Sequence, residues 1–254
     1  MKYSIIIPAY NEEKRIAATL KDYCTYFSHF PKKETEILVV LNGCRDNTLS
    51  IVQQFAKKYS LLRYVNIPEA IGKGGAVIEG FRRAKGDFVG YADADDATQA
   101  QYYHDLIKQI GDADGIIASR WMKGAVVEPK QPFSRRFASR CFNFLIHILF
   151  GLPFHDTQCG CKMFRAEALR KILPSLGMTR WAFDIDVLYH LKRQGFFVKE
   201  IPTVWKDRIG SSILVSRVSV EMFFAIVRLR LLYSPFKFLI SIYNRIAAAL
   251  GIKF

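Results

Sequence analysis

The sequence predicts an α/β fold in which a mainly parallel sheet is flanked by helices. Along the first half of the chain, short apolar runs alternate with amphipathic stretches of helical period. Strands separated by helices of this length form βαβ units, whose strands run parallel. Polar residues follow several of the apolar runs, and parallel sheets bind ligands at that end of their strands. We therefore expect one ligand-binding crevice along this edge of the sheet.

The first half of the chain provides five expected strands and four expected helices. The strands are short apolar runs, many of them rich in β-branched residues, and the helices have apolar residues at intervals of three or four. The expected strands are residues 3–7, 37–41, 62–67, 87–92 and 115–118. The expected helices are residues 12–27, 47–59, 72–84 and 100–110, with Asn11 placed to cap the first of them.

The second half of the chain changes character. Residues 133–150 mix three arginines into a dense apolar block, and residues 156–165 have the small and polar composition of a loop. We expect a helix over residues 181–192. Residues 196–206 predict a pair of strands, or a strand and a turn.

The composition restricts the class of partner. The 254 residues carry a formal net charge of +14 and half of them are hydrophobic, so we expect a globular chain that favours anionic ligands or surfaces. The five cysteines are odd in number and scattered, which argues against a disulfide framework. The chain runs directly into its first strand, so we expect no signal peptide. No charge-free apolar run of about 18 residues predicts a transmembrane helix.

Three aspartates follow the expected strand over residues 87–92. Asp93 and Asp95 stand one residue apart, so both carboxylates can reach one hard divalent ion, Mg²⁺ or Mn²⁺, together with a diphosphate. Such an ion would neutralise charge on a leaving nucleotide diphosphate. A solvated acidic turn that caps the next helix is the other interpretation. Lys73 lies among glycines at the start of an expected helix, where free backbone N–H groups favour an anion.

A series of short motifs carries a family resemblance. In chain order they are IIIPAYNEE (residues 5–13), GKGGAV (72–77), YADAD (91–95), ASR (118–120), DTQCGCKMF (156–164), RWAFD (180–184) and IP (201–202). Over residues 3–212 the sequence resembles inverting glycosyltransferases of family 2, whose type A fold has a Rossmann-like, mainly parallel sheet. The later motifs are similar to the branch of dolichyl-phosphate glucosyltransferases and polyprenyl-phosphate mannosyltransferases. The resemblance implies transfer of a hexose from a nucleotide sugar to a polyprenyl-phosphate lipid.

The resemblance also implies a donor site. Lys73 would lie near the diphosphate, Asp93 would face the nucleotide, and Asp95 would bind the metal ion, Mg²⁺ or Mn²⁺. The loop after the first strand would line the nucleotide pocket through Pro8, Tyr10 and Glu12.

Two positions depart from the family pattern. Leu41 and Asn42 stand where relatives often carry paired acids, so the base contact that we assign to Asn42 leaves uridine and guanosine nucleotides open. Ala97 replaces the glutamine that mannosyl-transferring relatives use as a further metal ligand. The run from Asp93 to Thr98 fits the glucosyl branch better, which favours UDP-glucose over GDP-mannose as the donor.

On the acceptor side, a lipid monophosphate is already an anionic nucleophile, so cations that position it matter more than a general base. Arg120 matches a Ser-Arg pair of the family and is our main catalytic candidate on this side. Asp184 falls where relatives that transfer to a hydroxyl keep a base. Here it would orient the sugar or Arg120, or serve as an acid at a helix N-terminus. The other acceptor-phosphate candidates are Arg135 or its neighbour Arg136, Gln158 and Lys162.

The end of the chain predicts association with a membrane surface. Residues 218–232 and 235–252 combine aromatic and aliphatic residues with several basic ones. Helices of this kind lie in the bilayer interface, with basic side chains on anionic headgroups. We therefore expect a catalytic domain over residues 1–212 and membrane-associating helices over residues 213–254, on the cytoplasmic face of a membrane. Core helices, a dimer interface and a transmembrane hairpin are the other interpretations.

Other functions stay open. The same fold could serve a polysaccharide, glycolipid or protein acceptor, and a catalytically silent, membrane-bound binding module is a further alternative. A nucleic-acid-binding protein is disfavoured, because the basic residues are interleaved with long apolar stretches and no recognition module occurs. We expect a nucleotide sugar, a polyprenyl phosphate and a membrane surface as partners, and no nucleic acid. The oligomeric state is left open.

Overall fold

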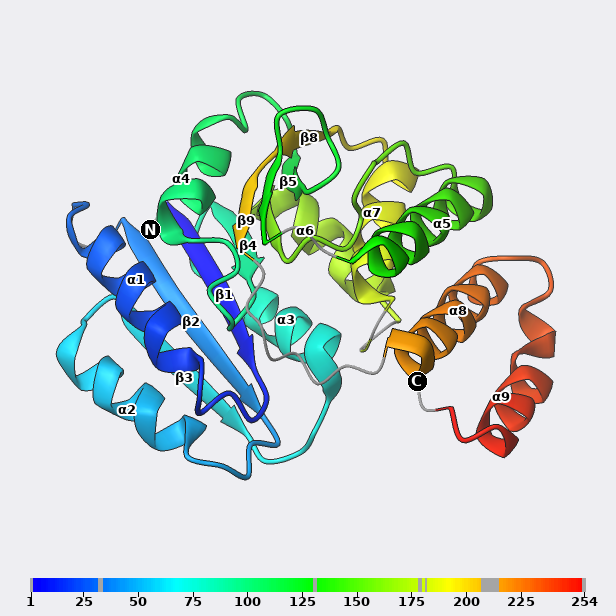
Figure 1. The fold of residues 1–254 in the computed structure, drawn as a ribbon, viewed down its shortest axis with the longest axis horizontal. Coiled ribbons are helices and arrows are strands. Elements are labelled where there is room, and N and C mark those ends of the chain that lie inside the picture. Colours follow the sequence, from blue (N-terminus) through cyan, green and yellow to red (C-terminus); the bar gives the residue numbers. More distant parts are fainter. Residues whose placement is uncertain are drawn as a thin grey trace.

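A seven-stranded sheet forms the centre of the molecule (Figure 1). The computed structural model describes residues 2–31, 34–129, 132–177, 180, 182–206 and 215–252. The strands of the sheet are β1 (Tyr3–Ala9), β2 (Thr35–Asn42), β3 (Leu62–Ile67), β4 (Phe88–Ala92), β5 (Gly115–Ser119), β7 (Cys161–Arg165) and β8 (Val198–Pro202). Their order is β3-β2-β1-β4-β7-β5-β8. β7 runs antiparallel to both neighbours, and the other pairs are parallel.

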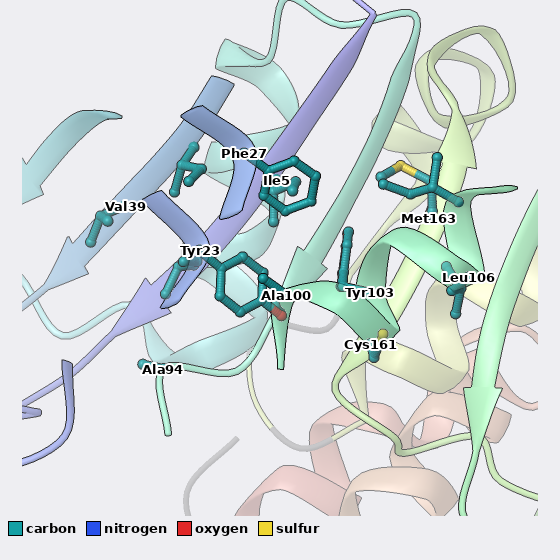
Figure 2. Packing of buried hydrophobic residues seen from close by; sticks show 14 of the residues in the cluster. Ile5, Tyr23, Phe27, Val39, Ala94, Ala100, Tyr103, Leu106, Cys161 and Met163 are labelled. Atoms are coloured by element: carbon teal, nitrogen blue, oxygen red, sulfur yellow. The ribbon is translucent and has the colours of Figure 1, made fainter. Parts of the chain in front are cut away.

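Helices cover both faces of the sheet. The central strands present apolar side chains alternately to each face, so both faces must be shielded from water. In β1, Ile5 packs into the core on one face and Ile6 into the core on the other. Figure 2 shows the first of these cores, in which Tyr23 and Tyr103 lie beside each other. The helices on this face are α1 (Ile16–Ser28), α2 (Thr48–Lys58) and α4 (Ala100–Lys108). On the opposite face lie α3 (Gly72–Arg83), α6 (Ala166–Ile172) and α7 (Phe183–Arg193).

Two further parts complete the fold. The strands β6 (Val126–Glu128) and β9 (Val204–Lys206) pair in parallel as a small second sheet. The helices α5 (Phe133–Phe150), α8 (Val215–Leu232) and α9 (Ile240–Ala249) lie together at one end of the molecule, far from α1 and α2 (Figure 1). α8 packs against both α5 and α9, and single turns of 3-10 helix occupy Leu173–Ser175 and Lys237–Leu239.

The structure confirms the predicted α/β fold with its mainly parallel sheet. Each strand expected in the first half is present, with bounds within two residues of the prediction. The two strands expected over residues 196–206 also exist, but β8 joins the main sheet and β9 the small one. None of the described helices is both long and apolar enough to cross a membrane. The predicted boundary at residues 212 and 213 lies outside the described residues.

Two predicted elements are wrong. Residues 161–165 are the strand β7 and not part of a loop. Lys162 interrupts the apolar run of this strand, but its ammonium group is buried against Asp184, so the charge does not keep the strand at the surface. The first helix begins at Ile16 and Asn11 does not cap it. Asn11 has a φ of 53°, and its Oδ1 accepts the backbone N–H of Arg45 instead.

Candidate functional site

The carboxyl end of β4 places an aspartate against a lysine. Asp93 follows β4 directly, and Lys73 lies in the first turn of α3, with its Nζ 2.5 Å from Asp93 Oδ1. The backbone N–H of Asp93 donates to the carbonyl oxygen of Gly160, 3.2 Å away. A Cβ atom at Gly160 would overlap the Asp93 carboxylate, so the approach of these two segments requires a glycine.

Lys73 keeps its positive charge at this position. Partial burial works against the charge, but the carboxylates of Asp93 and Asp184 outweigh it and raise the pKa of Lys73 above its ordinary value. The lysine also stands at the N-terminus of α3, where backbone N–H groups lack partners within the helix. The two features together favour an anion beside Asp93.

Asp95 provides a carboxylate suited to a divalent cation. Its Oδ1 accepts the backbone N–H of Ala97 at 3.1 Å, and both burial and the charge of Asp93 raise its pKa. Such mutual repulsion between carboxylates would be relieved by Mg²⁺ or Mn²⁺, which prefer oxygen ligands. Within the described residues, no group of three or more His, Cys, Asp or Glu side chains could hold a metal alone. Asp95 therefore fits an ion that takes its other ligands from a diphosphate and water.

The loop after β1 carries the next residue that the sequence assigns to the donor side, Glu12. Glu12 is half-buried and pairs with Arg15 through two contacts of 2.8 and 2.9 Å. Burial raises the pKa of Glu12 against the opposing effect of Arg15, and the charges of Asp95 and Asp93 raise it further. The assignment of Glu12 to the nucleotide pocket stays a prediction. Of the other residues assigned to this loop, Pro8 is buried in β1 and Tyr10 is exposed.

Asn42 lies at the end of β2 and is almost completely buried. Its Nδ2 donates to the carbonyl oxygen of Ala9 at 3.1 Å, so the side chain ties the ends of β1 and β2 together. The base contact assigned to Asn42 stays a prediction, because this amide group is engaged with the backbone.

A buried network surrounds the Asp184 carboxylate. Lys162 is fully buried, and its Nζ lies 2.6 Å from both Asp184 Oδ1 and the carbonyl oxygen of Cys159. The hydroxyl of Tyr91 donates to the same Asp184 oxygen. Asp184 therefore faces two donors inside the protein, and the amine of Lys162 is not at the surface, where we expected it to meet a phosphate. A buried ion pair of this kind is satisfied by its own partners.

Arg120 forms the second charged cluster of the site, together with Asp156. The guanidinium Nε and Nη2 lie 2.7 and 3.0 Å from the two Asp156 oxygens, and the Arg120 backbone N–H also donates to this carboxylate. Burial alone would raise the pKa of Asp156, but the charge and hydrogen bonds of Arg120 outweigh it, so that pKa lies below its ordinary value. The guanidinium also lies over the rings of Trp121 and Trp205.

The remaining acceptor candidates are Gln158 and Arg135. The backbone N–H of Gln158 donates to Asp156, and its side chain reaches Met222 of α8. Arg135 is half-buried in the first turn of α5. A different arginine of α5, Arg140, has its guanidinium over Trp121 at 5.8 Å.

Sequence reasoning missed the roles of Asp156, Gly160 and Arg140. Asp156 and Gly160 lie inside a motif that we quoted, but the motif does not say what they contact. Their partners lie far away in sequence, Arg120 36 residues before Asp156 and Asp93 67 residues before Gly160. These contacts follow from the insertion of β7 between β4 and β5.

Comparison with known proteins identifies the family. Residues 4–173 match glycosyl transferase family 2. The chain is 33% identical over 241 residues to the dolichyl-phosphate beta-glucosyltransferase ALG5C of Trichomonas vaginalis. The alignment covers 91% of this chain and 71% of ALG5C. It is also 31% identical over 211 residues to the glycosyltransferase AglD of Haloferax volcanii. That alignment covers 82% of this chain but only 34% of AglD.

A solved structure has the same fold. The crystal structure of glucosyl-3-phosphoglycerate synthase from Mycobacterium tuberculosis, in complex with Mn²⁺, UDP and glucosyl-3-phosphoglycerate, matches with a TM-score of 0.66. The match covers 89% of this chain and 78% of the synthase at 15% identity, so it supports the type A fold alone. The family match and the curated relatives carry the assignment further: the chain belongs to glycosyl transferase family 2 and is a glycosyltransferase.

Proposed function

We propose that this glycosyltransferase transfers glucose from UDP-glucose to a polyprenyl phosphate. The observation that carries the proposal is the arrangement around β4, where Lys73, Asp93 and Asp95 lie at its carboxyl end. Arg120, held by Asp156, is the cation that we assign to the acceptor side of this site. The dolichyl-phosphate beta-glucosyltransferase that matches 91% of the chain supports both the sugar and the lipid acceptor.

The donor would lie with its diphosphate between Lys73 and Asp95. Lys73 would pair with phosphate oxygens, aided by the N-terminus of α3. Asp95 would hold Mg²⁺ or Mn²⁺, which supplies positive charge to the departing diphosphate when bound. The Mn²⁺ and UDP in the structurally similar synthase support this choice of cofactor and nucleotide.

The acceptor would react without a general base. One phosphate oxygen of the lipid attacks the anomeric carbon of the sugar as the bond from that carbon to the diphosphate breaks. The products are a glycosyl phosphate lipid with inverted anomeric configuration and a free nucleoside diphosphate. No proton must leave the nucleophile, so the site needs cations and alignment. Asp156 fixes Nε and Nη2 of Arg120, whereas its Nη1 makes no hydrogen bond with the described residues and could bind the phosphate.

We place this reaction at a membrane surface, because a polyprenyl phosphate is a membrane lipid. The cytoplasmic face is part of the same proposal. The helices of residues 213–254 would hold the catalytic domain, residues 1–212, against the bilayer as a peripheral protein. The separation into these two parts is a proposal that rests on the basic and apolar composition of the tail.

The test is transfer of radiolabelled sugar into organic-extractable lipid. Purified protein, a polyprenyl phosphate and Mn²⁺ or Mg²⁺ are supplied with either UDP-glucose or GDP-mannose. The two donors are compared because Leu41 and Asn42 replace the acids that relatives often carry at the base. We expect label in the lipid phase from UDP-glucose, and none once the metal is chelated.

Two variants control this assay. Asp95→Asn keeps the size of the side chain and removes its charge, and we expect it to abolish transfer. Asp105→Asn, at an exposed position on α4, is the matched control and keeps full activity. Label from GDP-mannose alone would replace glucose by mannose in the proposal. Metal-dependent release of nucleotide without lipid label would retain the enzyme class and reject the acceptor.

A further inference from the structure

Exposed apolar side chains gather at one end of the molecule. Of the sixteen exposed large hydrophobic side chains among the described residues, four lie on α5, two on α8 and six between residues 236 and 250. α5 contacts α8, and α8 contacts α9, so these side chains belong to adjoining helices (Figure 1). Large exposed apolar areas of this kind mark interaction surfaces.

α5 contributes an exposed apolar stripe to this end of the protein. Phe133, Phe137, Phe144 and Ile148 recur at intervals of four and seven residues, which puts them along one side of a helix. Ile146 and Phe150, on the other side of α5, are buried in the core. The helix is therefore anchored to the catalytic domain by one face and leaves the other uncovered.

The charge of these helices selects the partner. α5 carries three arginines and no acidic residue, and Arg136 and Arg140 are exposed beside the apolar stripe. Between residues 220 and 252 there are four basic residues and one acidic residue, Glu221. Apolar side chains among positive charges match a bilayer surface with anionic headgroups. A second copy of the chain fits poorly, because a symmetric interface would bring like charges together.

The same end of the protein adjoins the acceptor-phosphate candidates. Arg140 of α5 lies over the ring of Trp121, the neighbour of Arg120. Asn143, one turn further along α5, accepts hydrogen bonds from the backbone and hydroxyl of Thr157, beside Gln158. A surface that docks on lipid at this place would bring a membrane-embedded phosphate toward the second charged cluster.

We propose that α5, α8 and α9 form one docking surface for an anionic bilayer, with the exposed stripe of α5 as an essential part. This surface extends the membrane contact beyond the tail and into the catalytic domain. The inference builds on the proposed function, since a lipid acceptor gives the docking its purpose, but vesicle binding can be measured without catalysis.

The test is co-sedimentation with vesicles. Vesicles of equal parts phosphatidylglycerol and phosphatidylcholine are compared with vesicles of phosphatidylcholine alone, over a series of salt concentrations. We expect the full chain to bind the anionic vesicles, and binding to weaken as salt rises. Phe144→Ser combined with Ile148→Ser should bind about tenfold more weakly or worse, because two apolar side chains no longer enter the bilayer.

The matched control is Phe197→Ser. Phe197 is 64% exposed, close to the 66% of Phe144, but it directly precedes β8 and belongs to none of the helices α5, α8 and α9. We expect this variant to bind like the unchanged protein. Arg136→Glu is a second variant on the exposed face of α5, and it should weaken binding to anionic vesicles only. Circular dichroism establishes that each variant is folded.

Three results would overturn the inference: no binding of the unchanged protein, unaltered binding of both α5 variants, or an α5 variant that only converts a dimer into a monomer. Glucose transfer to a polyprenyl phosphate in detergent is measured in parallel. If the unchanged protein docks through α5 but transfers no glucose, the proposed function fails and the docking surface stands. If the α5 variants transfer normally in detergent and lose only vesicle binding, both stand.

Discussion

Gly160 sets the position of Asp93, because no side chain fits between the two residues. We predict that Gly160→Ala keeps the fold but displaces the Asp93 carboxylate from Lys73. If Asp93 binds the donor as proposed, a displacement of its carboxylate by about 1 Å should reduce kcat/KM about a hundredfold. Steady-state transfer assays with UDP-glucose measure the loss, and thermal unfolding shows whether the fold is retained.

A second glycine provides the control for this variant. A Cβ atom at Gly177 would meet Tyr233 and Leu232 only at ordinary contact distances, so Gly177→Ala should leave kcat/KM unchanged. Equal activity of the two alanine variants would contradict the role that we give to Gly160.

The pair of Arg120 and Asp156 makes a prediction about pH. Asp156 is fully buried and its pKa lies below the ordinary value, so its ionised form stabilises the fold above pH 4, where an unfolded aspartate is also ionised. This contribution is lost as the pH falls through the pKa of the folded protein. At pH 7, Asp156→Asn should cost about 3 kcal/mol in the free energy of unfolding.

The cost of Asp156→Asn should therefore shrink as the pH is lowered below about 4. Denaturant titrations of the unchanged protein and the variant, repeated at descending pH, measure this difference. A cost that stays constant down to the lowest pH at which both proteins fold would show that the aspartate is not held ionised by Arg120.

Single residues also mark where sequence reasoning reached its limit. Asp93, Asp95 and Lys73 could be found because each stands at the end of a strand or the start of a helix, where the chain order reveals the neighbourhood. Lys162 was assigned to a phosphate because relatives carry an arginine at the matching position and a lysine can also contact phosphate. Its partner Asp184 lies 22 residues away on α7, and local pattern does not reveal such a pair.

At the scale of elements, β7 separates what the sequence could predict from what it could not. The strands β1, β2, β4 and β5 have clear apolar runs, because they are buried on both faces. β7 is short, antiparallel and carries Lys162 and Arg165, so its composition is not that of a core strand. Hydrogen bonds to two neighbouring strands, and the partner of Lys162, stabilise it instead.

The junction between α7 and α8 gives a prediction at this scale. The hydroxyl of Tyr233, just after α8, lies 2.9 Å from Asp186 Oδ1, and Asp186 is fully buried on α7. Because a hydrogen bond to a buried carboxylate is stronger than one between neutral groups, Tyr233→Phe should lower the free energy of unfolding by about 2 kcal/mol.

Tyr243→Phe is the matched variant for this junction. It also removes one tyrosine hydroxyl, but that hydroxyl donates to the neutral carbonyl oxygen of Phe224, 2.7 Å away within the end of the chain. We expect a loss of about 1 kcal/mol, and denaturant unfolding compares the two. A larger loss for Tyr243→Phe would show that the carboxylate of Asp186 does not anchor α8.

At the scale of the whole molecule, the two ends of the protein differ in their surface chemistry. The sheet edge near Lys73 brings carboxylates and a cation together, and the end built from α5, α8 and α9 exposes apolar and basic side chains. The composition of the tail pointed to a membrane surface. The share of α5 in the proposed docking surface could not be predicted, because its apolar block also contains core residues such as Ile146, and only the fold separates the two faces.

The most direct test of the account is calorimetric binding of UDP-glucose with and without Mn²⁺, because the donor site around β4 is its central claim. We predict that Mn²⁺ strengthens binding by about tenfold or more in the unchanged protein and in Asp105→Asn. In Asp95→Asn this enhancement should vanish. If UDP-glucose binds Asp95→Asn as tightly as the unchanged protein, with the same response to Mn²⁺, the site proposed at the end of β4 is contradicted.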